Sequence, residues 1–360
     1  SKCFSAGTSE LKVCVWGPMI FTPPSFRFST ANMEGARGSD SGQGIAGGMI
    51  PGSGAPAFTL ENLENAAIPV LIAAPHGGRA YPARIADAMR NPAIAQLRLE
   101  DRHVDRLALE VARQTGAASL IAHAPRAMLD LNRAPDDMDW SMVADAPADR
   151  PAHSSANRRA RSGLGLVPRR VSGVGEIWRT DLTSAEVAER IALIHEPYHR
   201  ALARALDAIR RTWGVALLID LHSMPPLAAS HPGQRPTEFV IGDRFGASCE
   251  DGVAGRALQF LGRSDRGVAH NRPYAGGYVL DRHGRPGLGI NALQLEVCRT
   301  LYLDARLAGT SARLPGVARL IAELVRTLGA DSPQIIFSTG DPQDIPADIA
   351  ALGCTLEKPY

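Results

Sequence analysis

Between residues 68 and 328 the sequence alternates short apolar runs with longer amphipathic segments. A short, continuous apolar run is typical of a strand that is buried on both faces, and apolar residues spaced three or four positions apart are typical of a helix. Strands that alternate with helices indicate a parallel sheet covered on both faces. We therefore expect an α/β fold of three layers, in which a mostly parallel mixed sheet lies between two layers of helices.

The same pattern predicts the individual elements. The expected strands are residues 69–74, 119–123, 127–131, 215–221, 238–242 and 290–297. The expected helices are residues 101–114, 184–213 and 311–328. For helix 184–213 we expect Thr183 or Ser184 as the N-cap and Gly214 as the terminator, and we expect Pro197 to kink or divide the helix.

Both ends of the chain lack this alternation. Residues 29–57 are dominated by Gly, Ser, Ala and Pro, a composition that buries little apolar surface. We expect residues 1–57 to be a disordered or non-native extension, residues 58–328 to form the catalytic domain, and residues 329–360 to form a tail of unknown role.

The charge and cysteine content narrow the cellular setting. The 39 basic and 37 acidic side chains nearly cancel, and no apolar run is long enough to cross a membrane, so we expect neither a nucleic-acid partner nor a membrane partner. The 5 cysteines form no C-x-x-C pair, and their odd number argues against a disulfide framework. A reducing, cytoplasmic location is the simplest expectation.

Polar residues lie at the ends of several predicted strands. In an open α/β sheet the ligand site forms beyond the carboxyl ends of the strands, so we expect these side chains to meet at one rim. They are His76, Asn132, Arg133, Asp220, His222 and Glu296.

Two histidines and one carboxylate are the usual ligands of a hydrolytic zinc ion, which keeps a fourth position open for water. His76 and His222 are the natural pair, although either one alone is more often a hydrogen-bonded structural residue. Asp101 and Asp105 are four residues apart and share a face of the predicted helix. We favour Asp105 as the acidic ligand, with Asp101 as its orienting neighbour or as the ligand itself.

Metal-assisted hydrolysis also needs a base and a partner for developing negative charge. Glu296 ends an otherwise apolar strand, so we expect burial to raise its pKa toward the range of a base. Arg126 and Arg133 have the planar set of donors that suits an oxyanion and a substrate carboxylate. His195 and His199 lie on the predicted helix 184–213, and we expect them to be packing or surface groups.

Six motifs occur in the order that is typical of one known family. They are Pro75-His76-Gly77-Gly78, Asp101-Arg102-His103-Val104-Asp105, Arg126-Ala127-Met128-Leu129-Asp130-Leu131-Asn132-Arg133, Glu196-Pro197-Tyr198-His199, Asp220-Leu221-His222-Ser223-Met224-Pro225 and Asn271-Arg272-Pro273-Tyr274, the last leading to Gly276-Gly277-Tyr278. Together with Leu295-Glu296 they resemble the N-formylglutamate amidohydrolase family over residues 68–328.

That family is similar to the zinc carboxypeptidases and aspartoacylases, so the resemblance implies a zinc-carboxypeptidase-like α/β fold with one zinc ion. The implied roles are His76, Asp105 and His222 as zinc ligands, Glu296 as the base, Arg126 as the group that polarises the scissile carbonyl, and Asn132 with Arg133 as the clamp for a substrate carboxylate. One departure is that the wider group places its acidic ligand three residues after the first histidine, where this chain has Arg79. Arg272 and Tyr274, in a Gly-rich loop that can close over a small ligand, are expected to hold a second carboxylate.

The activity implied by the resemblance is hydrolysis of N-formyl-L-glutamate to formate and L-glutamate, a step of histidine degradation. The expected partner is thus a small acidic N-acyl amino acid. One alternative keeps the chemistry but acts on another N-acyl amino acid or a cell-wall amide. A second alternative, of another class, is a non-catalytic relative that binds a metal or a metabolite.

Overall fold

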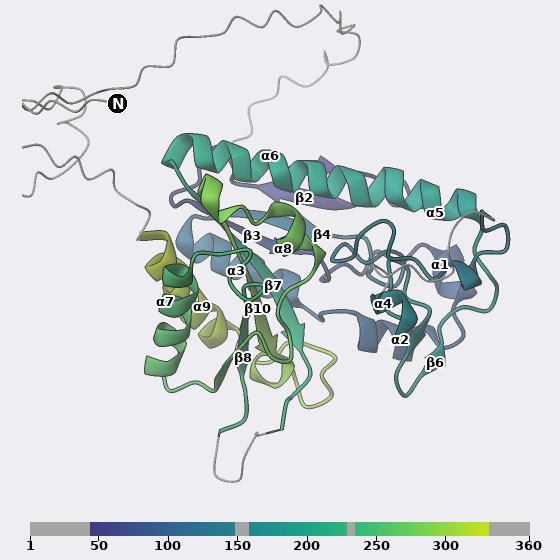
Figure 1. Cartoon of the computed structure of the whole chain (residues 1–360). Coiled ribbons are helices and arrows are strands. Elements are labelled where there is room, and N and C mark those ends of the chain that lie inside the picture. The colour runs from purple at the N-terminus through teal and green to yellow at the C-terminus, as the bar shows by residue number, and fades with distance from the viewer. Residues whose placement is uncertain (1–43, 148–157, 229–234, 331–360) are drawn as a thin grey trace, which may run out of the picture. The chain divides into compact units, whose positions relative to one another are not determined.

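The computed structural model describes residues 44–147, 158–228 and 235–330, and in these residues the central feature is an eight-stranded mixed sheet (Figure 1). The strands, in the order in which they lie side by side, are β1 (Ile45–Gly47), β2 (Phe58–Glu61), β4 (Ala118–Ala122), β3 (Val70–Ala74), β7 (Ala216–Met224), β10 (Ile290–Cys298), β8 (Phe239–Gly242) and β9 (Val268–His270). The four central strands β4, β3, β7 and β10 run parallel to one another, whereas β2 and β8 pair with them in the antiparallel sense.

Helices cover both faces of this sheet (Figure 1). The main helices are α1 (Ala83–Ala88), α2 (Pro92–Leu99), α3 (Val104–Thr115), α5 (Ser184–Arg190), α6 (Glu196–Trp213), α7 (Asp251–Arg263), α8 (Tyr278–His283) and α9 (Leu314–Ala330). A short helix α4 (Arg158–Arg161) and a two-stranded ribbon of β5 (Arg170–Val171) and β6 (Gly175–Glu176) lie outside the main sheet. The predicted three-layer α/β fold is confirmed.

Successive residues of each central strand pack into two different cores, because side chains of a strand alternate between the two faces of its sheet. In β7, Ala216 and Leu218 belong to the core that contains the apolar face of α6, while Leu217 and Ile219 belong to the core that contains α3, α7 and α9. The continuous apolar runs of the sequence therefore reflect strands that are covered on both sides.

The long predicted helix 184–213 is divided. Thr183 caps α5 with a reciprocal capping box to Glu186, and Gly214 ends α6 in a left-handed conformation, as expected. Between α5 and α6 the chain makes one π-helical turn, Ile191–His195, just before Pro197. Proline has no N–H to donate within the helix, and the Leu193 carbonyl instead accepts the backbone N–H of Met49 at 2.9 Å.

Two expectations about the chain are wrong. Residues 127–131 form no strand: Met128 and Leu129 donate their N–H groups to the Pro125 carbonyl in a buried turn, because a short apolar run has the same composition in a strand and in a buried loop. The extension does not reach residue 57 either, since β1 pairs with β2 and the side chain of Ile50 is fully buried. Residues 1–43 and 331–360 lie outside the described part of the chain.

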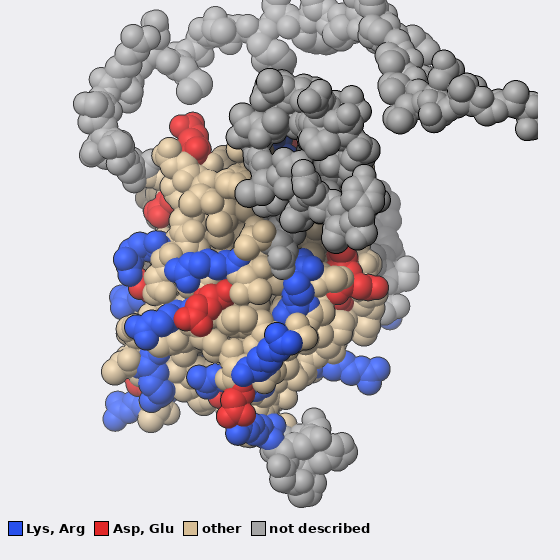
Figure 2. All heavy atoms as spheres, turned by 90° about the vertical axis from the view of Figure 1, so that its left-hand side faces the viewer, with Lys and Arg blue, Asp and Glu red and all other residues tan. Residues whose placement is uncertain are grey.

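The surface that Figure 2 shows carries basic and acidic side chains interspersed among uncharged ones. No helix in the part of the chain that the structure describes is both long enough and apolar enough to span a membrane.

Candidate metal centre and active site

Four polar side chains project from the carboxyl-terminal halves of two adjacent parallel strands. The register of β7 and β10 places Gln294 beside Asp220 and Glu296 beside His222. These residues follow, at alternate positions, the apolar residues that pack under α6, so the face that begins each strand as core ends it as a polar site. The sheet therefore fixes this part of the site rigidly.

The other two members of the candidate centre come from loops. His76 lies two residues after the end of β3. Asp101 lies between α2 and α3, where its backbone N–H donates to the His76 carbonyl at 3.0 Å. As whole residues, His76 and Asp101 are 2% exposed and His222 is 3% exposed. Sequence reasoning therefore paired the correct strands, because His76 and His222 both lie at the carboxyl ends of neighbouring parallel strands.

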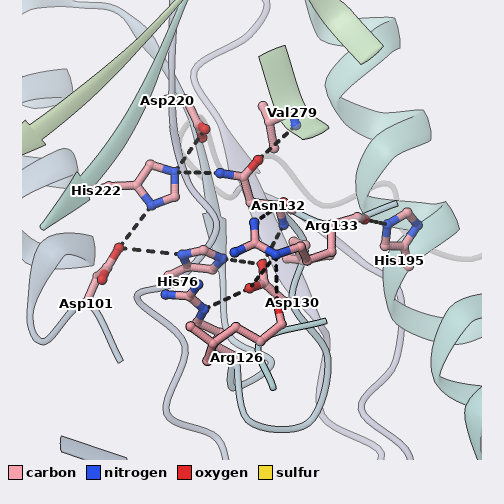
Figure 3. Close-up of polar contacts among 12 residues, drawn as sticks. His76, Asp101, Arg126, Asp130, Asn132, Arg133, His195, Asp220, His222 and Val279 are labelled. Carbon is pink, nitrogen blue, oxygen red and sulfur yellow. Dashed lines mark hydrogen bonds and ion pairs between the residues drawn. The ribbon is translucent and has the colours of Figure 1, made fainter. Parts of the chain in front are cut away.

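His76, Asp101 and His222 converge on one point (Figure 3). The Nδ1 atom of His222 lies 3.0 Å from Asp101 Oδ2, and the Nδ1 atom of His76 lies 3.6 Å from the same oxygen. One ligand atom from each residue lies within 4.8 Å of the other two. The buried Nδ1 atom of His76 has no hydrogen-bond partner among the described residues, so the group fits a cation that would take these three atoms as ligands.

The remaining nitrogen of each histidine meets a buried carboxylate. His76 Nε2 lies 2.7 Å from Asp130 Oδ1, and His222 Nε2 lies 2.9 Å from Asp220 Oδ2. A carboxylate that accepts one N–H of an imidazole fixes the tautomer and turns the other nitrogen toward a metal. Arg299 completes the arrangement, because its Nη2 lies 3.3 Å from Asp101 Oδ1 and leaves Oδ2 to face the histidines.

The charges in this group are strongly coupled. Burial opposes ionisation of Asp101, but the hydrogen bond from His222 and the neighbouring imidazole of His76 hold its pKa well below the usual range. Burial likewise opposes a charged His222, but the charge of Asp220 and the hydrogen bonds to Asp101 and Asp220 raise its pKa well above the usual value. These contacts favour a protonated His222, and a cation bound at its ring nitrogen would displace that proton.

Glu296 has the environment of a general base. The residue is 6% exposed, and burial raises the pKa of its carboxyl group to about 7, against the lowering effect of a charged His222. Gln294 Nε2 donates to Glu296 Oε1 at 2.9 Å and orients the carboxylate. A pKa near the working pH suits a group that must first accept and then return a proton.

Two guanidinium groups share the Asp130 carboxylate. Arg126 Nε lies 2.9 Å from Asp130 Oδ2, and Arg133 Nε lies 3.9 Å from the same oxygen. Arg133 also donates from Nε to the Leu164 carbonyl at 2.9 Å. Because one carboxylate faces two arginines, this side of the site carries a surplus of positive charge that suits an anionic substrate.

The other substrate-binding candidates differ in their surroundings. Asn132 is held by the protein itself, since its Oδ1 accepts the Val279 N–H at 2.9 Å and its Nδ2 lies 3.3 Å from Gln294 Oε1. Tyr274 is half-buried, and burial together with the nearby charge of Glu296 raises its pKa. Arg272 is exposed.

Asp105, which the sequence favours as the acidic ligand, is not part of the group of His76, Asp101 and His222. Its carboxylate makes a two-pronged ion pair with Arg79, at 2.9 and 2.7 Å. The four-residue spacing predicts Asp101 and Asp105 on one helical face, but α3 begins only at Val104, after His103 in a left-handed conformation with φ 57°. Asp101 therefore precedes the helix and points to the histidines, and it replaces Asp105 as the candidate ligand.

Sequence reasoning did not assign roles to Asp130, Gln294 and Arg299. Asp220 could have been paired with His222, because residues two apart in a strand share a face. The contact between Asp130 and His76 joins residues 54 positions apart, and no spacing in the sequence predicts it.

The fold and this site together define a class of α/β proteins with a candidate metal centre at the carboxyl ends of central parallel strands. The model of the N-formylglutamate amidohydrolase family matches residues 68–303. The chain is also similar to the N-formylglutamate deformylase of Pseudomonas aeruginosa, with 32% identity over 242 residues that cover 66% of this chain and 83% of the relative. The chain therefore belongs to the N-formylglutamate amidohydrolase family.

Further relatives agree with this assignment. The N-formylglutamate deformylase of Pseudomonas putida is 32% identical over 245 residues, which cover 66% of this chain and 82% of the relative. A crystal structure of N-formylglutamate amidohydrolase from Ralstonia eutropha JMP134 has a TM-score of 0.67 and 33% identity, and covers 77% of this chain and 98% of that chain. The structure of gene product Atu2144 from Agrobacterium tumefaciens, at 18% identity and a TM-score of 0.56, shares the fold and covers 77% of this chain and 96% of that chain.

Proposed function

We propose that this protein hydrolyses N-formyl-L-glutamate to formate and L-glutamate with one bound divalent metal ion, most simply zinc. The observation that carries the proposal is the buried group of His76, Asp101 and His222 with Glu296 on the adjacent strand, in a chain whose relatives are named N-formylglutamate deformylases. When bound, a zinc ion would supply Lewis acidity, lowering the pKa of a water ligand and polarising a carbonyl.

The residues of this chain have separate tasks in the reaction. Glu296 takes a proton from the attacking water, whose oxygen bonds to the formyl carbon, and returns the proton to the amide nitrogen as the C–N bond breaks. The electron pair of that bond leaves with the nitrogen, so formate and the free amino group of glutamate result. Arg126, which pairs with Asp130, stabilises the negative charge that develops on the formyl oxygen.

The arginines of the site would bind the carboxylates of an acidic substrate. Arg133, with Asn132 beside it, holds one substrate carboxylate by charge-assisted hydrogen bonds, and Arg272 and Tyr274 hold the second. A cytoplasmic location and a role in histidine degradation fit this substrate.

The direct test is release of formate from N-formyl-L-glutamate by the purified, zinc-loaded full chain, measured beside N-acetyl-L-glutamate and neutral N-formyl amino acids. We expect N-formyl-L-glutamate to have the highest kcat/KM and the chelated protein to be inactive. A preference for another acyl group would point to the alternative substrate class. If no N-acyl amino acid is hydrolysed by metal-loaded protein, the proposed function is wrong.

A further inference from the structure

A second group of buried histidines lies next to the backbone segment that carries Asn132. His195 ends the π-helical turn, His199 lies one turn later on α6, and His283 ends α8. The three residues are 0%, 0% and 4% exposed, respectively. The expectation that His195 and His199 are packing or surface groups is therefore incomplete, because buried imidazoles need hydrogen-bond partners.

The partners of this group are the backbone carbonyls on either side of Asn132. His199 Nε2 lies 3.0 Å from the Leu131 oxygen. His195 Nε2 contacts the Arg133 oxygen (Figure 3), at 2.9 Å. A carbonyl oxygen only accepts hydrogen bonds, so both imidazoles must donate through Nε2. His195 and His199 share a helix face because they are four residues apart, and together they hold the backbone at both ends of Asn132.

The third histidine fixes the tautomer of the second. His283 Nε2 lies 2.9 Å from His199 Nδ1. Since a neutral His199 already donates through Nε2, its Nδ1 accepts and His283 donates. Burial favours the uncharged form of all three: it lowers the pKa of His195, lowers that of His199 well below the usual value, and lowers that of His283 to about 3.

Helix α8 holds the same segment from another direction. At its start, the Val279 N–H donates to Asn132 Oδ1 at 2.9 Å, and at its end His283 reaches the Leu131 carbonyl through His199. The approach at the start is close, because a Cβ atom on Gly277 would lie 2.5 Å from Asn132 Oδ1. Only glycine therefore allows α8 to meet the Asn132 amide in this way.

We infer that His195 and His199 are positioning residues for substrate binding: by holding the carbonyls of Leu131 and Arg133, they set the orientation of the Asn132 amide and the Arg133 guanidinium. The inference rests on the proposed function in one respect, namely that Asn132 and Arg133 bind the substrate carboxylate. It does not depend on the metal group, because none of the three histidines is among the candidate ligands.

The test compares His199→Leu, which loses the donor, with His199→Gln, whose side-chain amide can donate from nearly the same place as Nε2. Loss of one buried hydrogen bond that leaves a carbonyl unsatisfied corresponds to roughly 5- to 150-fold in an equilibrium constant. We expect His199→Leu to raise KM for N-formyl-L-glutamate by about this factor with kcat and zinc content nearly unchanged. His199→Gln should restore most of the loss.

Hydrogen exchange gives a readout that does not need activity. Peptides that cover residues 128–134 should exchange faster in metal-loaded His199→Leu than in the wild type, and His199→Gln should return them toward the wild-type rate. Tyr198→Phe is the matched control, since the buried Tyr198 hydroxyl on the same helix has no hydrogen-bond partner among the described residues. Its exchange and KM should match the wild type.

Equal behaviour of the Leu and Gln variants would overturn the inference, and so would a lower unfolding temperature of His199→Leu with unchanged KM and unchanged exchange at 128–134. If His199→Leu does not fold, His195→Leu and His195→Gln repeat the comparison at the Arg133 carbonyl. If the wild type hydrolyses no N-acyl amino acid, the proposed function fails, but the exchange comparison still decides whether the histidines hold this segment.

Discussion

Among the residues that the structure describes, two buried groups of histidines differ in what their ring nitrogens contact. In the first, His76 and His222 donate from Nε2 to carboxylates and turn Nδ1 toward a third carboxylate. In the second, His195 and His199 donate from Nε2 to backbone carbonyls. The histidines of the first group contact carboxylates, so that group can bind a cation. The histidines of the second group contact uncharged carbonyls, so that group can hold the backbone in place.

This difference shows why the role of a histidine cannot be assigned from the sequence alone: it depends on the partners of the ring nitrogens. All four imidazoles are buried to a similar degree, so burial does not separate ligand from scaffold. The charge of the hydrogen-bond partner does separate the two roles. A neighbouring carboxylate favours a charged or metal-bound imidazole, whereas a carbonyl in an apolar surrounding favours a neutral imidazole.

The largest expected effect is on the base that only the first group has. Glu296→Gln keeps the shape of the side chain but removes its ability to accept a proton. We expect kcat to fall by about 100- to 10,000-fold with zinc content unchanged, as measured by formate release and elemental analysis. A non-catalytic metal-binding relative would show no turnover to lose, and a variant with near-normal kcat would remove Glu296 from the mechanism.

Metal affinity should separate the two histidine groups. We expect His222→Ala to weaken zinc binding by more than about 100-fold, the upper end of what loss of an outer partner alone costs, while His199→Gln keeps the wild-type affinity. Competition with a fluorescent chelator measures both. Equal loss in the two variants would mean that the groups do not differ as proposed.

The two candidate acidic ligands allow a sharper test within the first group. Asp101→Asn should lower zinc affinity by about tenfold or more, because the amide carries no charge toward the cation. Asp105→Asn should leave the affinity unchanged and weaken only the ion pair with Arg79, which is partly exposed and contributes about 1 kcal/mol at most. The reverse result would restore Asp105 as the ligand.

The smallest expected effects are the pH dependences of stability in metal-free protein, and they have opposite signs. Folding raises the pKa of Glu296 from 4.5 to about 7, so the proton bound in the folded state stabilises the protein below pH 4.5, and this contribution is lost as the pH rises through 7. Folding lowers the pKa of His199 below 6.5, so its contribution is present above pH 6.5 and is lost as the pH falls.

Chemical denaturation between pH 4.5 and 7 measures both contributions. In the wild type, Glu296 makes the free energy of unfolding decrease as the pH rises, and Glu296→Gln should remove this decrease. His199 makes the free energy of unfolding increase as the pH rises, and His199→Gln should remove this increase. Each contribution is at most about 1.4 kcal/mol per pH unit. Slopes of the same sign would show that the two groups do not differ in charge.

Most of the fold followed from the sequence because its central strands are covered on both faces and therefore appear as continuous apolar runs. β3, β7 and β10 all lie within a residue or a few of their predicted bounds. The predicted strand 127–131 failed because its apolar residues are buried in a turn, where periodicity carries no information.

The site was only partly predictable. His76, His222 and Glu296 stand at the carboxyl ends of strands, and the rule that ligands bind there was enough to find them. The choice between Asp101 and Asp105 depended on where α3 begins, and the left-handed His103 that delays the helix has no sequence pattern we could use. The pairing of Asp130 with His76 is a tertiary contact between distant loops.

The bond between the Met49 N–H and the Leu193 carbonyl has a practical consequence for anyone who reshapes this protein. This hydrogen bond holds the turn that ends in His195, although the composition around Met49 suggests a dispensable segment. A truncated protein that starts at β2 would lose the hydrogen bond and with it one support of the turn that carries His195. An affinity tag or fusion partner is therefore better joined ahead of Gly44 than in place of the stretch that follows it.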